Sequence, residues 1–295
     1  MDVSIALEAP AKVNLGLRIV GRRADGYHLL ESLFAPVDLA DAIALRIESA
    51  GAAAEVSLAI AGDAAGAPPG DDNLAVRGAR AFLARAGITA RVHIGLTKRT
   101  PVAAGLGGGS SDAAAVLRGL AQAFPAAVPA EALEEIALAL GADVPFFLDP
   151  RPAWVTGVGE RRAPVAGLPS LALVLANPGV ALATAEVFRA FDAIGAPSAP
   201  RAGAPTSLAF ELAEDGALAA RLHNDLEAPA VRLCPPIARL RAQLHGAGAR
   251  AVGMSGSGAT VYGVFGDRPA AERAAAAIAV AGRGWTRVAA TRESR

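Results

Sequence analysis

The chain has 295 residues, 53% of them hydrophobic, which is enough for one or two packed domains. Its 28 Lys plus Arg residues balance its 28 Asp plus Glu residues, so no overall field attracts nucleic acid or an anionic membrane. A charged fraction of 19% argues against intrinsic disorder, and one cysteine, Cys234, excludes an internal disulfide or a zinc site of several cysteines. We interpret Cys234 as a small buried apolar side chain.

The high hydrophobic content raises the question of a membrane span. The longest uncharged stretch, residues 163–185, is interrupted by prolines, whereas a spanning helix needs about 20 predominantly apolar residues. Residues 1–4 lack the basic flank and apolar run of a secretion signal. We therefore expect a soluble cytoplasmic protein.

The first third of the chain alternates hydrophobic with other residues in three places, a pattern typical of half-buried strands. These predicted strands cover residues 13–19, 43–47 and 92–96. On the third of them, His93 is expected to face outward. Apolar residues at helical spacing predict a helix over 74–86, with Asn73 as its N-cap and Gly87 as its stop.

Helical and strand patterns are mixed in the rest of the chain. The predicted helices cover residues 113–123, 130–140, 185–193, 218–226, 237–244 and 270–281. The predicted strands cover residues 153–155, 171–175, 285–290 and two stretches of 252–265 around a Ser-Gly-Ser-Gly turn. Residues 195–205 are typical of a loop, and 195–216 match no motif. The mixture predicts an α+β protein of two domains, residues 1–155 and 156–295.

The strongest motif is glycine-rich and precedes the predicted helix 113–123. Four glycines within residues 105–109 permit positive φ and close backbone approach. The helix that follows offers unpaired N–H groups and the positive end of its dipole. Together these features favour a phosphate site. An ordinary turn capped by Ser110 or Ser111 is the alternative, but such a turn needs one glycine and not four.

Two common nucleotide-binding motifs fit this segment poorly. A P-loop ends in Gly-Lys-Ser/Thr, and no lysine follows these glycines. The dinucleotide fingerprint expects an acidic residue at a strand end about 20 residues further on, where this chain has helical Glu131, Glu134 and Glu135. The missing acidic ribose contact argues against a nucleotide-dependent oxidoreductase.

Only two of the basic residues are lysines, Lys12 and Lys98, and the others are arginines. A lysine that persists against such a bias can be needed for its compact ammonium. Lys12 starts a predicted strand, and Asn14 projects to the same face because strand residues two apart share a face. An ammonium beside an amide suits a phosphate or a substrate hydroxyl, and a lysine at a strand edge is the alternative interpretation.

Three further motifs supply candidate residues. Asp143 directly follows a helix stop and precedes a proline and two aromatics, where a desolvated carboxylate can act as a general base. On this motif alone a turn aspartate is the better interpretation. The sequence Asp-Gly-Tyr-His predicts a turn that presents Tyr27 and His28, either for ring stacking or for turn packing. Residues 253–258 predict a second glycine turn, which either closes over phosphates or only reverses the chain.

Together and in this order, the motifs resemble those of the GHMP small-molecule kinases over nearly the whole chain. The segments that carry the resemblance are residues 10–15, 23–28, 101–114, 141–146 and 255–259. The glycine segment, residues 101–111, resembles the superfamily in general. The sequence Asp-Gly-Tyr-His selects the branch with a cytidyl substrate over homoserine, mevalonate or galactose kinases. The resemblance implies an N-terminal domain like ribosomal S5 domain 2 and a ferredoxin-like C-terminal domain.

The resemblance also implies the substrates. ATP is the implied phosphate donor, with Mg2+ whose ligands are not assignable from the sequence. The implied acceptor is the C2 hydroxyl of 4-diphosphocytidyl-2-C-methyl-D-erythritol, in the non-mevalonate route to isoprenoids. Neither nucleic acid nor a membrane is an expected partner, and the sequence does not indicate an oligomeric state.

Each role is carried over onto a matching residue. Asp143 is the implied base for the C2 hydroxyl, and Lys12 is its cationic partner. The implied ATP contacts are Pro101, Val102, Ala103, Ala104, Gly105, Leu106, Gly107, Gly108, Gly109, Ser110 and Ser111, with Asn73 and Lys98 near the adenosine. The implied acceptor contacts are Asn14, Tyr27, His28, Thr184 and Phe188, with Tyr27 and Phe188 as the walls that enclose the cytosine.

Two alternatives stay open. One is another GHMP kinase, of the homoserine or mevalonate type, against which Asp-Gly-Tyr-His and Phe188 argue. The other is a non-catalytic nucleotide-binding relative on the same scaffold. The presence of both Lys12 and Asp143 argues against it, because a protein without activity need not keep them.

Overall fold

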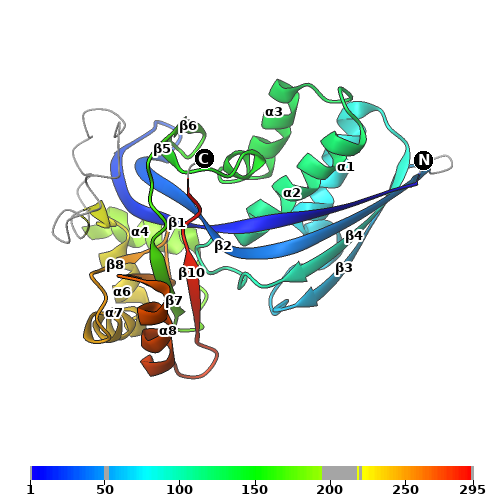
Figure 1. Ribbon diagram of the computed structural model, residues 1–295. Helices are drawn as coiled ribbons and strands as arrows, with labels where there is room; N and C mark the ends of the chain where they lie inside the picture. The colour runs from blue at the N-terminus through cyan, green and yellow to red at the C-terminus, as the bar shows by residue number, and fades with distance from the viewer. Residues whose placement is uncertain (1, 50–52, 195–217, 219–220, 294–295) are drawn as a thin grey trace. The chain divides into compact units, whose positions relative to one another are not determined.

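The computed structural model describes residues 2–49, 53–194, 218 and 221–293 (Figure 1). It divides into two compact units, and each is described by itself. Unit 1 comprises residues 1–11, 39–102 and 107–150, and unit 2 comprises 12–38, 103–106 and 151–295. Two long strands, β1 (Asp2–Arg22) and β2 (His28–Ser49), contribute to both units. The boundary between residues 155 and 156 stays a prediction.

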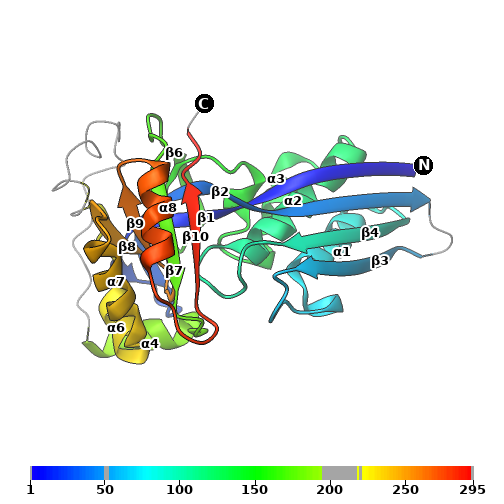
Figure 2. The same ribbon diagram turned by 60° about the horizontal axis from the view of Figure 1, so that its bottom comes forward.

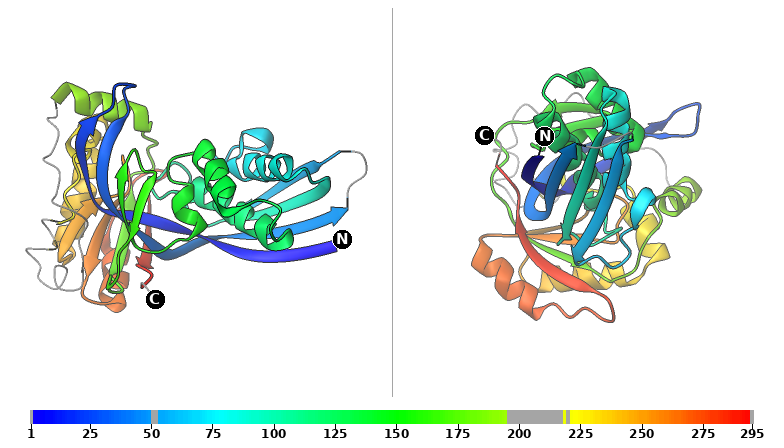
Figure 3. Two further views of the ribbon diagram at one scale, coloured as in Figure 1. Left: turned by 90° about the horizontal axis from the view of Figure 1, so that it is seen from above. Right: turned by 90° about the vertical axis from the view of Figure 1, so that its right-hand side faces the viewer.

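Unit 1 is a sheet covered on one face by helices (Figure 3). Its strands are β1, the second half of β2, β4 (Ala90–Lys98) and β3 (Glu55–Gly62). β2 runs antiparallel to β4, whereas β3 and β4 are parallel. The helices are α1 (Leu74–Ala86), α2 (Gly108–Ala123) and α3 (Ala130–Leu140), with short 3₁₀ turns η1 (Gly70–Asp72) and η2 (Pro145–Leu148).

The predicted ends of α1 are confirmed. The side chain of Asn73 accepts a hydrogen bond from the N–H of Ala75, which satisfies one of the unpaired groups of the first turn. Gly87 ends the helix with a left-handed φ of 64°. The start of α2 differs from the prediction, because the helix already begins at Gly108 within the glycine segment.

Unit 2 contains a second, antiparallel sheet in the order β10-β7-β9-β8. These strands are β7 (Ala172–Asn177), β8 (Ala251–Met254), β9 (Val261–Phe265) and β10 (Trp285–Ala290). Helices α7 (Pro236–Gly246) and α8 (Arg268–Ala277) pack against it (Figure 2). The other elements are α4 (Thr184–Ile194), α6 (Glu227–Leu233), β5 (Ala153–Gly157) and β6 (Arg161–Pro164). Cys234 is buried in this core, as predicted for a small apolar side chain.

Two predicted helices need correction, and one strand of the unit 1 sheet was missed. The helix predicted over 218–226 does not extend to residue 226. Asn224 instead forms a parallel bridge with Leu17, and the next helix, α6, starts only at Glu227. Tertiary pairing with β1 here overrides local helical propensity. The last helix ends at Ala277 rather than 281, and β3 was not predicted. The loop expected over 195–205 lies outside the described residues.

None of the helices within the described ranges combines the length and the hydropathy needed to cross a membrane.

Candidate functional site

The glycine segment contains three left-handed residues and ends in a helix start. Ala103, Gly105 and Gly107 have φ of 53°, 74° and 71°. Gly107 is the N-cap of α2, and no described side chain caps that first turn by a hydrogen bond. Several N–H groups at the start of α2 therefore remain available for an anion, and the helix dipole favours negative charge there.

The two glycine turns of the sequence meet inside unit 2. Ser255 Oγ donates to the carbonyl of Gly105 at 2.9 Å. A Cβ on Gly105 would lie 2.6 Å from the carbonyl oxygen of Ser255 and 2.9 Å from that of Gly258, closer than real Cβ atoms approach. Gly105 is therefore required for backbone-to-backbone packing, and the second turn supports residues 103–106.

Lys12 and Asn14 share one face of β1, as predicted. The Lys12 ammonium donates to Asn14 Oδ1 at 2.5 Å and lies 4.4 Å from the centroid of the Phe34 ring. Asn14 Nδ2 donates in turn to Ser32 Oγ at 2.8 Å. The main chain of Lys12 donates to the carbonyl of Leu106 at 2.9 Å, which ties this strand to the glycine segment. Both Lys12 and Asn14 are buried.

Sequence reasoning missed the residues that hold Asn14 in place. Tyr262 donates its hydroxyl to the carbonyl of Asn14 at 2.7 Å, and the N–H of Asn14 donates to Ser255 Oγ at 3.2 Å. Burial raises the pKa of Tyr262 far above its usual value, so it stays a neutral donor. Ser255 lies in a recognised motif, whereas nothing in the sequence marks Ser32 or Tyr262.

Asp143 lies in unit 1, in the turn between α3 and η2. It is half-buried, and the next residues along the chain, Val144 to Phe147, are fully buried. The main chain of Val144 donates to the carbonyl of Gly141, which closes the turn that carries Asp143. Asp143 thus lies in a turn that is followed by buried, mostly aromatic residues, as the sequence predicted.

The Asp-Gly-Tyr-His motif forms the tip of the β1–β2 hairpin in unit 2. The N–H of Arg23 donates to the carbonyl of Tyr27 at 2.7 Å, and Gly26 takes a φ of 92°. Tyr27 is 65% exposed, the most exposed large apolar side chain among the described residues. The turn therefore leaves a phenol ring open for stacking.

His28 points away from that tip, onto α4. Its ring stacks on Phe188 with centroids 4.7 Å apart, and its Nε2 lies 2.6 Å from Asp192 Oδ1. His28 thus covers one face of Phe188, an arrangement that the expected cytosine sandwich did not anticipate. Thr184 begins α4 and shares a hydrogen bond of 3.0 Å with Ser257 of the second glycine turn.

The second lysine, Lys98, is buried in unit 1 rather than open to a ligand. Its ammonium donates to Asp41 and, at 2.7 Å, to Asp112. Burial raises the pKa of Asp112 to about 7, and the charge of Lys98 only partly offsets this. Asn73, the other expected adenosine contact, is engaged as the N-cap of α1.

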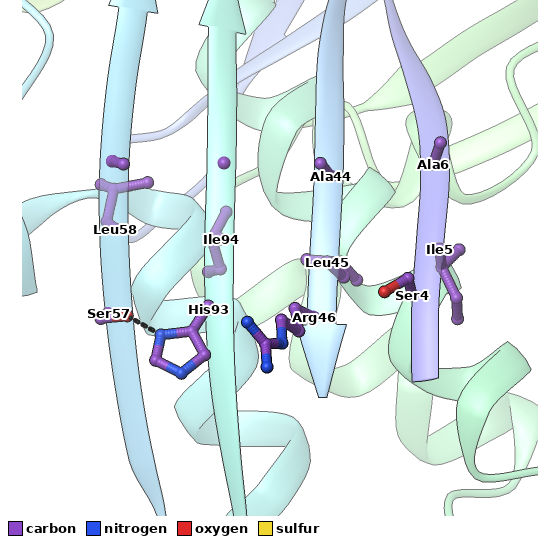
Figure 4. Close-up of a pocket in the computed structure, with 12 residues that line it drawn as sticks. Ser4, Ile5, Ala6, Ala44, Leu45, Arg46, Ser57, Leu58, His93 and Ile94 are labelled. Atoms are coloured by element: carbon purple, nitrogen blue, oxygen red, sulfur yellow. Dashed lines mark hydrogen bonds between the residues drawn. The ribbon is translucent and has the colours of Figure 1, made fainter. Parts of the chain in front are cut away.

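A pocket on the open face of the unit 1 sheet is lined by none of these motif residues. Small side chains such as Ala44 line its floor, and His93 shares a hydrogen bond of 2.7 Å with Ser57 (Figure 4). His93 is thus an outward strand residue, as predicted. The described residues include no group of three or more His, Cys, Asp or Glu side chains that could hold a metal ion.

Comparison with known proteins identifies the family. Residues 73–149 match the GHMP kinases N terminal domain, and residues 209–283 match the GHMP kinases C terminal domain. A relative from Methylobacterium radiotolerans is 47% identical over 95% of this chain and 96% of its own. The chain belongs to the GHMP kinase family. That relative, like one from Anaeromyxobacter dehalogenans that is 48% identical over 92% of this chain and 83% of its own, is a 4-diphosphocytidyl-2-C-methyl-D-erythritol kinase.

Solved structures support the two-domain GHMP kinase fold. A crystal structure of 4-(cytidine 5'-diphospho)-2C-methyl-D-erythritol kinase is 40% identical, with a TM-score of 0.75 over 97% of this chain and 99% of that one. Homoserine kinase from Cytophaga hutchinsonii has a TM-score of 0.70 over 98% of this chain and 95% of that one, but only 18% identity. The second likeness therefore concerns the fold alone.

Proposed function

We propose that this GHMP kinase transfers the γ-phosphoryl group of ATP to the C2 hydroxyl of 4-diphosphocytidyl-2-C-methyl-D-erythritol in the cytoplasm. The observation that carries the proposal is the 47% identity, over nearly the full length of both chains, to a relative of that name. The Asp-Gly-Tyr-His hairpin adds support, because its tip leaves Tyr27 open to stack on a base.

The phosphate end of the proposed site is built from main chain. Phosphoryl transfer depends mostly on positioning and charge neutralisation. The first turn of α2, which no described side chain caps, supplies N–H groups and a positive dipole end for the ATP phosphates. Mg2+ is proposed only as the companion of ATP, and it would neutralise part of the charge on the transferred group.

Asp143 is the proposed general base. It takes the proton of the C2 hydroxyl as that oxygen bonds to the γ-phosphorus, the bond from phosphorus to the bridging oxygen breaks, and ADP leaves. Lys12 is the proposed cationic partner of this step. Asp143 belongs to unit 1 and Lys12 to unit 2, so their pairing is itself part of the proposal. The buried hydrogen bond from Lys12 to Asn14 supports it by fixing the ammonium in one orientation.

The acceptor is tested by measuring ADP release with 4-diphosphocytidyl-2-C-methyl-D-erythritol, homoserine and mevalonate at equal concentrations. The proposal expects turnover with the first compound and background rates with the other two. Turnover with only homoserine or mevalonate would identify another GHMP kinase. No turnover with any of them, despite ATP binding, would favour a non-catalytic relative.

The base is tested with Asp143→Asn, which keeps the size of the side chain. We expect turnover to fall by roughly 100-fold or more while ATP affinity changes only several-fold. Asp71→Asn is the matched control, because Asp71 is an exposed carboxylate of unit 1 whose partner is Arg80. Unchanged turnover in Asp143→Asn would refute the assignment.

A further inference from the structure

Two charged residues that flank the glycine segment are joined within unit 1. Lys98 is the last residue of β4, and Asp112 lies in the second turn of α2. The ammonium donates to Asp112 Oδ2 at 2.7 Å and also to Asp41 of β2, and the three side chains are 0–4% exposed. The chain between Lys98 and Asp112 is therefore a closed loop whose two ends meet at one buried ammonium.

Asp41 also holds the main chain that enters this loop. Its Oδ1 accepts hydrogen bonds from the N–H groups of Arg99 at 2.6 Å and Thr100 at 2.7 Å. Charge-assisted bonds of this kind are short and directional. The backbone just before Pro101 is thus fixed to β2.

The exit of the loop rests on the same cluster. A Cβ on Gly108, the first residue of α2, would lie 3.4 Å from Lys98 Nζ and 2.9 Å from Thr100 Cγ2. A larger residue at position 108 would displace the Thr100 methyl group, so glycine suits this close packing. The main chain that offers N–H groups to an anion therefore packs directly on Lys98 and Thr100.

Such a cluster fixes the positions of the segments that it joins more than it stabilises the fold. Desolvation offsets most of the attraction in a buried ion pair, whereas removing one partner leaves an uncompensated charge. Within the described part of the chain, Asp112 Oδ1 and the hydroxyls of Thr100 and Ser111 are buried without a hydrogen-bond partner. Lys98 is thus the sole donor that links Asp112 to the rest of the cluster in this part of the chain.

We propose that Asp41, Lys98 and Asp112 are positioning residues, which hold both ends of the glycine segment so that the first turn of α2 is set for the ATP phosphates. The proposal rests on the proposed function for the identity of the nucleotide. It replaces the expected adenosine contact of Lys98 with an indirect role, in which the ammonium never touches the ligand.

Binding of adenosine and of a non-hydrolysable ATP analogue separates these two roles. In Lys98→Met we expect the Kd of the analogue with Mg2+ to rise on the order of tenfold or more, because misplaced donors lose the phosphates, while adenosine affinity stays within about threefold. Equal loss for both ligands would restore the direct adenosine contact. Unchanged affinity for both would show that the cluster has only a structural role.

Asp112 provides a matched pair of variants should Lys98→Met fail to fold. Asp112→Asn keeps an acceptor for Lys98 and is expected to regain most of the analogue affinity that Asp112→Ala loses. Equal affinities in the two variants would overturn the proposal. Glu55→Gln is the control, because it alters an ion pair with Arg91 on the exposed face of unit 1.

These binding measurements need no acceptor. A wild-type protein that binds the analogue but does not phosphorylate the cytidyl compound would therefore contradict the proposed function and leave the positioning role intact. Hydrogen exchange of residues 99–111 gives a second readout. Faster exchange is expected in Asp112→Ala, and exchange at the wild-type rate would count against the anchoring of this segment.

Discussion

Asp41 and Asp112 share one ammonium, yet their surroundings differ. Asp41 accepts two main-chain N–H groups in addition to Lys98. Within the described residues, Asp112 accepts only from Lys98, and its Oδ1 has no partner. Burial raises the pKa of this poorly satisfied Asp112 carboxyl to about 7.

This shift predicts how stability changes with pH. The folded state holds the Asp112 proton up to about pH 7, whereas the unfolded state releases it near pH 4. The stabilisation from this site is therefore complete below pH 4 and is lost as the pH rises to 7. Asp112→Asn removes the titration. The difference between the Tm of this variant and that of wild type should therefore increase from pH 5 to pH 8. The increase corresponds to on the order of 2 kcal/mol in the free energy of unfolding. A difference in Tm that is independent of pH would contradict the shift.

Asp192 is a second residue that acts through a neighbour. Its carboxylate lies 2.6 Å from His28 Nε2 and 3.5 Å from an Arg22 nitrogen, so it fixes the imidazole that stacks on Phe188. In Asp192→Ala we expect KM for the cytidyl acceptor to rise roughly tenfold and KM for ATP to stay the same, as steady-state kinetics will measure. Glu186→Ala is the control on the same helix, because among the described residues Glu186 pairs with exposed Arg189 and not with His28. A rise in KM for ATP alone would sink this role.

Motif residues were predictable from the sequence, but their partners were not. The period of two in β1 places Lys12 and Asn14 on one face, and their hydrogen bond confirms it. Asp41 and Asp192 reach their partners across 57 and 164 residues of sequence. No local pattern carries that information. The roles assigned to the motif residues stay predictions.

At the scale of elements, local signals decided which predictions held. α1 has both a capping residue and a glycine stop, and its bounds are confirmed. The end predicted near residue 226 lacks such signals, and pairing with β1 decided it instead. β3 was missed although Val56, Leu58 and Ile60 alternate with other residues, the same period of two that predicted the neighbouring strands.

The contact between the two glycine turns gives a prediction at this scale. Gly105→Ala adds a Cβ that would lie within 3 Å of two carbonyl oxygens, at a residue whose φ is 74°. We expect a loss of roughly 1–3 kcal/mol in the free energy of unfolding, together with a higher KM for ATP. Gly87→Ala is the control, because Gly87 has a similar φ of 64° and open space around it, and it should cost about 1 kcal/mol without changing KM. Equal effects in both variants would show that the close contact of Gly105 with the second glycine turn affects neither stability nor ATP binding.

At the scale of the whole molecule, a zero net charge has to be reconciled with two anionic substrates. The count of 28 basic and 28 acidic side chains gives no long-range field to draw phosphates in. Main-chain N–H groups and a helix dipole do not enter that count, and the start of α2 provides both. Of the two lysines, Lys98 adds no attraction for phosphates, because its ammonium is paired with the buried side chains of Asp41 and Asp112.

This balance predicts a weak dependence of ATP capture on salt. Exposed charges are screened beyond about 10 Å at 0.1 M ionic strength, whereas donors at a helix start act at contact distance. We expect kcat/KM for ATP to change less than about threefold when KCl is raised from roughly 0.05 to 0.3 M at a constant ratio of Mg2+ to ATP. The added salt is a chloride and not a sulfate, because sulfate can itself bind at the N-terminus of a helix and compete with ATP. A fall of about tenfold or more would mean that cationic side chains dominate the capture of ATP. The start of α2 would then not be the main element that binds the phosphates.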